Sequence, residues 1–431
     1  MKKILGTMTC LILIISTNAI GFTKEDEGWI KKFGGESLEY GYSCQQTYDG
    51  GYIVTGATFL HDAEGSRSYI WLIKVNSFGD KIWDRTYGEG GSFGYSVEQT
   101  NDGGYIIVGY GSFDNGYGLR DICLIKTDSS GYLEWVKTFG GEDIDVGCSV
   151  KQTYDGGYII VGETKSYGAG HSDVWLIKTD EYGDMIWDQT YGGSEYDIGD
   201  SVLQINDGGY VIVGETCSYG AGRGDVWLIK TDEYGNIIWD QTYGGYGGDR
   251  GHDVKQTLDG GYIIIGETHS FGYGGYDAWL IKTDEMGYIM WSTFFGTDGD
   301  DEGNSVDVTS DGGYIIAGGT WPYNVRFNSW LIKTDEDGME LWEHNYEQEH
   351  DNSLLCVQQT YDGGYIATGS LRYNYDKGNY DLLLIKTDSQ GEIEDKSRTP
   401  DAPLLSKILE FFFNRFPMFC KYIKLFANLL V

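Results

Sequence analysis

The chain has 431 residues, including 66 glycines, 35 tyrosines and only 4 prolines. Acidic residues outnumber basic ones by 66 to 31, so the formal net charge is −35. A surface of that charge repels phosphate backbones and excludes nucleic acid as a partner. Apolar residues make up 40% of the chain and are regularly patterned, which excludes an intrinsically disordered protein.

The first 21 residues have the three parts of a secretory signal. Lys2 and Lys3 are basic, residues 8–15 are mostly apolar, and residues 17–19 offer a small-residue cleavage site. The apolar run is too short to span a bilayer. We therefore expect a signal peptide over 1–21 and a secreted, extracellular protein.

Three sequence markers then repeat in phase, about every 52 residues. Asp-Gly-Gly-Tyr begins at Asp49, Asp102, Asp155, Asp207, Asp259, Asp311 and Asp362. Leu-Ile-Lys also occurs seven times, from Leu72 to Leu384. A tryptophan recurs at Trp29, Trp83, Trp135, Trp187, Trp239, Trp291 and Trp342. Such a period indicates a repeat architecture.

Residues 149–193 show what one repeat contains. Apolar and β-branched runs predict strands over 149–153, 158–164, 174–179 and 185–191. Tight turns separate the first two strands and the last two, and Gly183 is expected to take a left-handed conformation in the second of these turns. Four strands in about 52 residues make one blade of a β-propeller.

The chain ends predict how the ring closes. Residues 29–35 match the fourth strand of the repeat but precede the first complete unit, whereas 391–394 lack the tryptophan. We therefore predict an all-β, seven-bladed β-propeller of four-stranded blades over 22–398, closed by the N-terminal strand. A solenoid is the alternative, although solenoids usually carry capping repeats.

The stretches 178–187 and 230–239, Lys-Thr-Asp-Glu-Tyr-Gly followed by Trp, resemble the tryptophan-docking repeat of quinoprotein-like propellers. The whole repeat also looks like one found in secreted archaeal and bacterial proteins. The resemblance covers about 29–390 and implies the scaffold. Quinoprotein dehydrogenases typically have eight blades, and the alcohol-oxidising ones have a vicinal cysteine pair, which this chain lacks, so the redox activity is not implied.

Residues present in every blade are most simply explained by blade construction. We interpret as turn caps the aspartates Asp128, Asp180, Asp232, Asp284, Asp335 and Asp388. The repeated tryptophans are interpreted as packing between blades. An acid also recurs in the crossovers between blades and is interpreted as a cap: Glu39, Asp145, Asp197, Asp249 and Asp301, with Ser92 and Asn352 in the other two units.

The predicted binding site lies on the face that carries these crossovers and the loops between second and third strands. Those loops combine aromatic residues with glycine, and such a surface can stack on sugars or hold a peptide. The candidate binding residues are Tyr167, Tyr219, Phe271, Tyr273, Trp321 and Tyr323. The glycines alternatively serve only to make tight loops.

One crossover, residues 298–304, has alternating acids like the start of a calcium loop. Asp298, Asp300 and Glu302 are its candidate metal ligands. Thr309 stands where an EF-hand would have its glutamate, so a solvated acidic loop is the alternative reading. No other cofactor is expected.

The remaining motifs do not indicate an enzyme. The six histidines are scattered among the blades, and the chain has no Gly-x-Ser-x-Gly, phosphate-loop or His-Glu-x-x-His motif. The seven cysteines match neither a zinc site nor a dense disulfide framework and are interpreted as small buried apolar residues. The sequence thus predicts a non-catalytic binding or scaffold propeller for a glycan or protein. An enzyme acting on an extracellular polymer and a purely structural cell-surface protein are the alternatives.

Composition changes after Pro400, and residues 399–431 are predicted to form a linker and an amphipathic helical tail. Residues 404–431 are dense in Leu, Ile and Phe and carry four cations against Glu410. Pro417 is expected to divide the segment into two short helices. Such a segment suits contact with a membrane surface, outside the cell, or docking on a partner. Packing against the propeller itself is the alternative.

Overall fold

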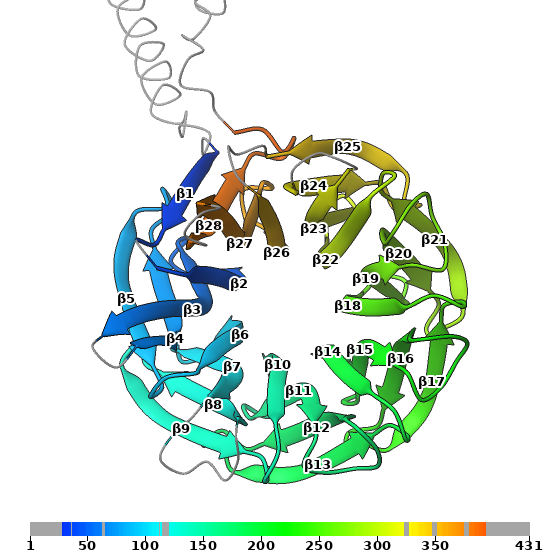
Figure 1. The fold of residues 1–431 in the computed structure, drawn as a ribbon, viewed down its shortest axis with the longest axis horizontal. Coiled ribbons are helices and arrows are strands. Elements are labelled where there is room, and N and C mark those ends of the chain that lie inside the picture. Colours follow the sequence, from blue (N-terminus) through cyan, green and yellow to red (C-terminus); the bar gives the residue numbers. More distant parts are fainter. Residues whose placement is uncertain are drawn as a thin grey trace, which may run out of the picture. The chain divides into compact units, whose positions relative to one another are not determined.

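The computed structural model describes residues 28–393 except 36, 63–64, 112, 114–119, 323–326, 347–350 and 375–378. Seven four-stranded antiparallel sheets are arranged in a ring (Figure 1), so the predicted seven-bladed propeller is confirmed. Within these ranges no helix could cross a membrane. The predicted signal peptide and the predicted tail lie outside the described residues.

Each blade runs from an innermost first strand to an outermost fourth strand (Figure 1). Blade 1 consists of β2 (Glu39–Gln46), β3 (Tyr52–Asp62), β4 (Gly65–Val75) and β5 (Lys81–Tyr87). Blade 2 consists of β6 (Phe93–Gln99), β7 (Tyr105–Gly111), β8 (Asp121–Thr127) and β9 (Leu133–Phe139). Blade 3 consists of β10 (Asp145–Gln152), β11 (Tyr158–Thr164), β12 (Asp173–Thr179) and β13 (Met185–Tyr191).

Blades 4 to 6 repeat this order. Blade 4 consists of β14 (Asp197–Gln204), β15 (Tyr210–Thr216), β16 (Asp225–Thr231) and β17 (Ile237–Tyr243). Blade 5 consists of β18 (Asp249–Gln256), β19 (Tyr262–Thr268), β20 (Asp277–Thr283) and β21 (Ile289–Phe295). Blade 6 consists of β22 (Asp300–Val308), β23 (Tyr314–Trp321), β24 (Asn328–Thr334) and β25 (Glu340–Asn345).

Blade 7 joins the two ends of the described chain. It consists of β26 (Asn352–Gln359), β27 (Tyr365–Asn374), β28 (Asn379–Thr387) and β1 (Trp29–Phe33). The pairing of β1 with β28 is antiparallel, with Trp29 opposite Lys386 and Phe33 opposite Leu382. Closure by the N-terminal strand is therefore confirmed, and it covers the sheet edge that β28 would otherwise expose.

The first strands begin earlier than the sequence predicted. In blade 3 the strand starts at Asp145 rather than Ser149, whereas the second and fourth strands match their predicted bounds. A bulge between Gly147 and Ser149 breaks the alternation of side chains that reveals a strand. A side chain at Gly147 would lie 2.5 Å from Val108 of the neighbouring blade, so the glycine permits this close approach.

The hydrophobic core lies between neighbouring blades. Each repeated tryptophan packs against the Asp-Gly-Gly-Tyr tyrosine of the next blade, which confirms the predicted packing role. The seven ring centroid distances are 5.8 to 6.1 Å, from Trp29–Tyr52 through Trp187–Tyr210 to Trp342–Tyr365. The same indole also lies against the turn glycine of that next blade, as Trp135 does against Gly183, which has the expected positive φ of 78°.

An ion pair between a largely buried lysine and a partly exposed aspartate joins two of the sequence markers inside each blade. The lysine of Leu-Ile-Lys reaches the aspartate of Asp-Gly-Gly-Tyr at 2.7 to 3.1 Å, as in Lys178–Asp155 and Lys386–Asp362. The same aspartate accepts a hydrogen bond from the second glycine of the motif, for example from Gly157 N at 3.0 Å. These contacts fix the hairpin between the first and second strands.

The aspartates that were interpreted as turn caps have that role. Asp180 Oδ1, for example, accepts hydrogen bonds from the backbone N–H groups of Tyr182 at 2.9 Å and Asp184 at 2.8 Å. The other blades repeat this pair of contacts, with Asn76 taking the aspartate's place in blade 1.

Candidate functional site

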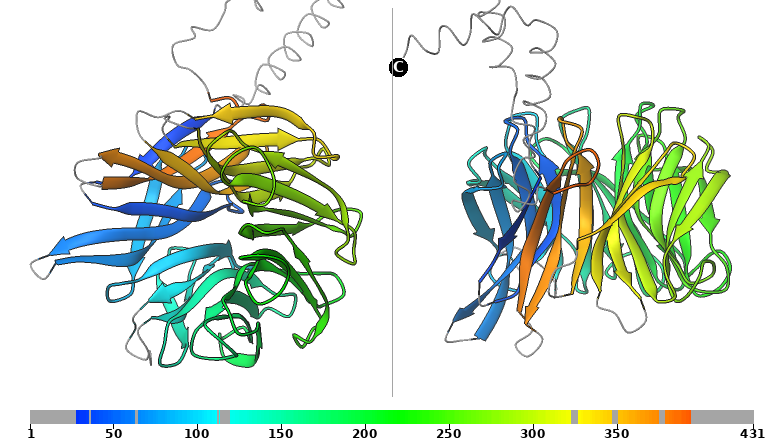
Figure 2. Two further views of the ribbon diagram at one scale, coloured as in Figure 1. Left: turned by 45° about the vertical axis from the view of Figure 1, so that its right-hand side comes forward. Right: turned by 90° about the horizontal axis from the view of Figure 1, so that it is seen from above.

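The crossover face is the face of the ring that carries the crossovers between blades and the loops between second and third strands. In blade 3, Tyr167 from the loop donates a hydrogen bond to the carbonyl of Gly140 in the crossover at 2.9 Å, so the two sets of loops meet as predicted. Two hairpins, β3–β4 and β27–β28, are longer than the others and project from this face (Figure 2).

The recurring acids hold the crossovers in place. Asp145 is fully buried and accepts hydrogen bonds from Ser166 Oγ at 2.7 Å and from the backbone N of Gly141 at 3.0 Å. It also accepts a short hydrogen bond from Thr164. Asp197 and Asp249 repeat these contacts in the next two blades. These acids thus stabilise the crossover loops, as their interpretation as caps requires.

The predicted aromatic binding residues that the structure describes are spread over blades 3 to 6. Tyr167, Tyr219 and Phe271 each pack on a tryptophan of their own blade, with ring centroids 5.2 to 5.4 Å apart. Tyr273, beside Phe271, has 77% of its surface exposed. The first three therefore seal their loops against the blades, and ligand binding by any of the four stays a prediction.

The two remaining predicted positions belong to blade 6. Trp321 is half-exposed and lies edge-on to Phe327 at 6.2 Å. Together with Asp298 and Asp300 it lines a surface hollow of about 540 Å³. Tyr323 lies outside the described residues.

The three predicted calcium ligands do not converge. Asp300 Oδ1 accepts a hydrogen bond from the backbone N of Tyr276 in blade 5 at 3.1 Å. Glu302, two residues further along β22, interacts mainly with Glu267, His252 and Asn304. Among the residues the structure describes, no three His, Cys, Asp or Glu side chains are grouped so that they could hold a metal ion.

The channel presents different residues from different blades. It is lined by the first strands β2, β6, β10, β14, β18, β22 and β26 (Figure 1). One position on these strands is occupied by Tyr42, Tyr95, Cys148, Asp200, His252, Asn304 and Leu355. All seven of these side chains line a cavity of about 600 Å³ at the crossover end of the channel. The repeat thus supplies one scaffold position, and six different residue types occupy it in the seven blades, with tyrosine in blades 1 and 2.

One side of this mouth is aromatic: Tyr42, Tyr95 and Tyr110 line the cavity, and Tyr40 and Phe93 pack against them. We call these five residues of blades 1 and 2 the aromatic arc. Its rings form a continuous cluster, with Tyr42 and Tyr95 at 4.9 Å and Phe93 and Tyr110 at 5.3 Å. Phe59 and Tyr380 extend the cluster to the bases of the two projecting hairpins. The Arg120 guanidinium lies 5.0 Å from the ring centre of Tyr110, so one cation already sits against this arc.

The opposite side is charged, and Glu163, Asp200, Arg250 and His252 line the cavity there. Glu215, Glu267 and Glu302 interact with these charges, and we call all seven residues, from blades 3 to 6, the ionic arc. At its centre Arg250 donates to both carboxylate oxygens of Asp200, from Nε at 2.9 Å and from Nη2 at 2.6 Å. Bidentate pairs of this kind are strong and fix the orientation of both side chains. The Asp200 carboxylate also raises the pKa of Arg250.

Burial alters the protonation of the glutamates around this pair. It raises the pKa of Glu163, Glu215 and Glu302 above the usual range. Burial acts on Glu267 in the same direction, but His252, whose Nε2 lies 4.0 Å from its carboxylate, and Arg250 together outweigh it and lower the Glu267 pKa. The ionic arc therefore combines a fixed ion pair with carboxyl groups that hold their protons more tightly than free glutamate does.

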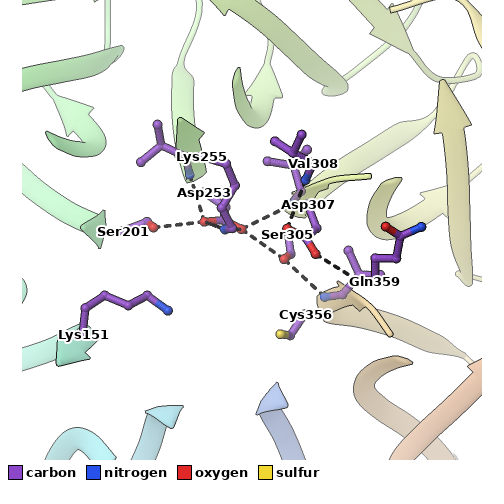
Figure 3. A network of polar contacts seen from close by, with 12 residues as sticks. Lys151, Ser201, Asp253, Lys255, Ser305, Asp307, Val308, Cys356 and Gln359 are labelled. Atoms are coloured by element: carbon purple, nitrogen blue, oxygen red, sulfur yellow. Dashed lines mark hydrogen bonds and ion pairs between the residues drawn. The ribbon is translucent and has the colours of Figure 1, made fainter. Parts of the chain in front are cut away.

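Deeper in the channel a second network is centred on Asp253 (Figure 3). Its carboxylate accepts hydrogen bonds from Ser201 at 3.0 Å and Ser305 at 3.1 Å, on the two flanking blades. Lys255 Nζ lies 2.6 Å from the same group. Although burial alone would raise the Asp253 pKa, the Lys255 ammonium and these hydrogen bonds lower it. Asp253 thereby links three neighbouring blades.

The prediction from sequence missed both arcs and this network. It separated repeated residues from unique ones but applied that distinction to loops rather than to the first strands. Serine, for example, stands at the Asp253 position in five other blades: Ser43, Ser96, Ser149, Ser201 and Ser305. Aligning the first strands of the seven units would have exposed Asp253 as a departure from the repeat, and the positions of Tyr95 and Arg250 as ones that vary between blades.

No family model and no curated protein matches this chain. Its fold is similar to several solved structures. YCF48 bound to D1 peptide has 11% identity and a TM-score of 0.48, covering 84% of this chain and 95% of that one. Sqt1 from Chaetomium thermophilum has 10% identity and a TM-score of 0.43, covering 83% and 98%. The Neurospora crassa Pan2 WD40 domain has 9% identity and a TM-score of 0.43, covering 84% and 99%.

At such identities no functional residue can be carried over from these structures. The candidate site follows instead from the residues of this chain. It is the crossover-face mouth of the channel, between the aromatic arc of blades 1 and 2 and the ionic arc of blades 3 to 6.

Proposed function

We propose that this protein is a non-catalytic extracellular binding propeller that holds a segment of a protein ligand in the crossover-face mouth of its channel. The observation that carries the proposal is the juxtaposition of the two arcs around one cavity of about 600 Å³. Concave sites with apolar walls and a few oriented polar groups are typical of ligand binding. Nothing in blade construction calls for such a departure from the repeat.

The chemistry of the two arcs favours a ligand with apolar or aromatic groups next to a basic one. The rings of Tyr42 and Tyr95 offer flat apolar contact, and aromatic faces attract cations. Glu163 and its neighbours lie opposite them, and the net charge of −35 attracts basic partners from a distance. A glycan, which also stacks on aromatic rings, is the other outcome of the test.

The test compares two variants of the full chain on peptide and glycan arrays, with affinities then measured by calorimetry. Tyr95→Leu removes a ring from the aromatic arc, and the fold tolerates leucine because Leu355 occupies the same position in blade 7. Tyr273→Ala is the control, since this exposed loop residue does not line the mouth cavity. We expect Tyr95→Leu to weaken binding of a peptide about tenfold or more and Tyr273→Ala to leave it unchanged.

The reverse result, in which only Tyr273→Ala weakens binding, would move the site to the loops. Selective binding of sugars that depends on Tyr95 would keep the site and change the ligand class. No binding to either array, with both variants folded, would remove the proposal.

A second candidate function is hydrolysis of an extracellular polymer at the same mouth. It is favoured by Glu163, whose raised pKa and position at the cavity suit a general acid. Glycosidases pair such an acid with a second carboxylate. Release of reducing sugar from a polysaccharide by the wild type, and its loss in Glu163→Gln, would establish this function in place of simple binding.

Secretion and membrane contact through residues 404–431 stay predictions from the sequence. The cations of the tail should favour anionic lipid headgroups while its apolar residues insert between them. Co-sedimentation with anionic vesicles should therefore be lost on truncation at Pro400. Equal sedimentation of both chains would show that the tail makes no membrane contact.

A further inference from the structure

Two cysteines from opposite ends of the chain meet where blade 7 adjoins blade 1. The backbone N–H of Cys44 on β2 donates to Cys356 Sγ of β26 at 3.4 Å, and the Cys356 thiol donates to the Cys44 carbonyl at 3.5 Å. Cys44 Sγ in turn faces blade 7, 4.0 Å from the Ile366 carbonyl. Both side chains belong to the hydrophobic cluster between the two blades and also line the channel.

Each of these cysteines is an exception within the repeat. The position of Cys356 is serine in five of the other blades and Asp253 in the sixth. The position of Cys44 is valine in all six other blades: Val97, Val150, Val202, Val254, Val306 and Val357. At each of these two positions cysteine therefore replaces the common residue in one blade only. The two cysteines face each other across the boundary between blade 7 and blade 1.

That boundary is the place where the ring can open. Crossovers connect the blades covalently all around, but inside blade 7 the strand β1 is held to β28 only by hydrogen bonds and packing. If β1 separates from β28, blade 1 moves away from the rest of blade 7. A covalent link between β2 and β26 would prevent this separation.

We propose that Cys44 and Cys356 form a disulfide that closes the ring covalently between blade 1 and blade 7. In this reaction the Cys356 thiolate attacks one sulfur of a small-molecule disulfide, such as glutathione disulfide, and releases one thiolate. Cys44 sulfur then attacks Cys356 Sγ and releases the second. The protein thiols lose two protons and two electrons in all, and the oxidant takes up both electrons as its sulfur–sulfur bond becomes two thiols.

The surroundings suit this order of events. The hydrogen bond between the two thiols lowers the pKa of Cys356 and raises that of Cys44, so Cys356 ionises first. Cys356 is only partly buried and lies at the channel, where an oxidant can reach it, whereas Cys44 is 5% exposed. Thiolate character and access are what select a cysteine for exchange.

The experiment is differential alkylation of the full chain before and after exposure to glutathione disulfide, followed by peptide mass spectrometry. We expect one crosslinked pair, Cys44 with Cys356, and a rise of about 3–8 °C in the melting temperature, because a disulfide spanning most of the chain restricts the unfolded state strongly. Cys44→Val and Cys356→Ser restore the residues common in other blades. They should fold and lose both the crosslink and the oxidant-dependent rise.

Cys148→Ser is the matched control, since Cys148 also lines the channel. It should keep both the crosslink and the rise in melting temperature. If Cys44 and Cys356 both remain alkylatable after oxidation of the folded chain, or if Cys148 is the partner found, the proposal is overturned. The two cysteines would then be small buried residues and nothing more. A failure here leaves the proposed ligand site untouched, because that site does not depend on these thiols.

Discussion

The outermost strands of the seven blades resemble one another, whereas the innermost strands differ at positions that line the channel. Every fourth strand except β25 ends in an aromatic residue, and the residue two positions before it varies between blades. All seven fourth strands carry the docking tryptophan, which makes the same contact with the next blade each time. The first strands share a bulge and a backbone path but differ at several positions that line the channel, such as the position of Tyr42, Cys148 and Asp200. Identical contacts indicate a stability requirement that each blade must meet. Different residues on an identical frame indicate a site that is built once for the whole ring.

The largest loss of stability should follow deletion of β1, because this strand closes the whole ring. Deleting β1 leaves β28 with an open edge and removes the contact between Trp29 and Tyr52. We expect loss of the single cooperative transition in urea unfolding followed by tryptophan fluorescence. A chain lacking only residues 22–27 is the control and should unfold as the mature protein does. An unchanged transition without β1 would mean that closure contributes little to the fold.

The next largest loss of stability should follow removal of a docking tryptophan, and the loss should be equal in different blades. Trp187→Ala and Trp239→Ala each remove one docking indole from the same contact, so both should lower the free energy of unfolding by about 2–4 kcal/mol. Ile186→Ala, at a neighbouring side chain that is 57% exposed, should cost less than about 0.5 kcal/mol. Urea denaturation measures all three. Costs that differ widely between the two tryptophans would contradict the equivalence of the outer strands.

Acid should weaken all blades together through the repeated ion pairs. Burial alone would raise the Asp259 pKa, but Lys282, Thr257 and the Gly261 N–H outweigh it and lower the pKa to about 2. Because this is below the usual value of about 3.9, the stabilisation is complete above about pH 4 and is lost as the pH falls towards 2.

The melting temperature should therefore drop over that range, and Asp259→Asn should make the drop shallower while lowering the melting temperature at pH 7. Melting curves between pH 2 and pH 7 measure both effects. A melting temperature that does not change between pH 4 and pH 2 would show that solvent at the exposed side of these aspartates screens the ion pairs completely.

The smallest effect on stability is expected in the channel. The double variant Asp253→Ser with Lys255→Leu installs the residues that blade 4 has at these positions, Ser201 and Leu203. Replacing an ion pair by residues of compatible shape is often nearly neutral, so we expect a change within about 1 kcal/mol. The single variant Asp253→Ser leaves Lys255 without its closest carboxylate and should cost more than the double variant. The reverse order of costs in urea unfolding would make this network a structural requirement rather than part of a site.

The sequence alone was sufficient for the blades and for ring closure, because these depend on local signals that recur seven times. Turn glycines, the docking tryptophan and the apolar runs of the second and third strands are readable in any one unit, as in residues 149–193. The start of the first strand was missed because the bulge at Gly147 interrupts its alternation. The ion pair between Lys178 and Asp155 joins two markers that were recognised separately, and only the register of the hairpins brings them together.

The candidate site was harder to predict because its residues come from several different blades. Tyr95 and Arg250 are far apart in the sequence, and each alone looks like an ordinary strand residue. Their common location follows only from closing the ring, which turns equivalent positions of seven strands into one wall. The loop aromatics were more conspicuous in the sequence, yet Tyr167 and Tyr219 mainly pack against their own blades.

The pairing of β1 with β28 also has a consequence for the order of folding. Six blades are continuous segments of chain and can form from neighbouring strands as soon as these are synthesised. Blade 7 needs Trp29 opposite Lys386, so the first strand of the propeller to be synthesised must wait for the last one. Contacts between such distant segments form slowly, because a long loop must close before they stabilise anything. Until then the growing chain is an open arc of blades, and only the arrival of β28 converts it into a ring with a channel and a mouth.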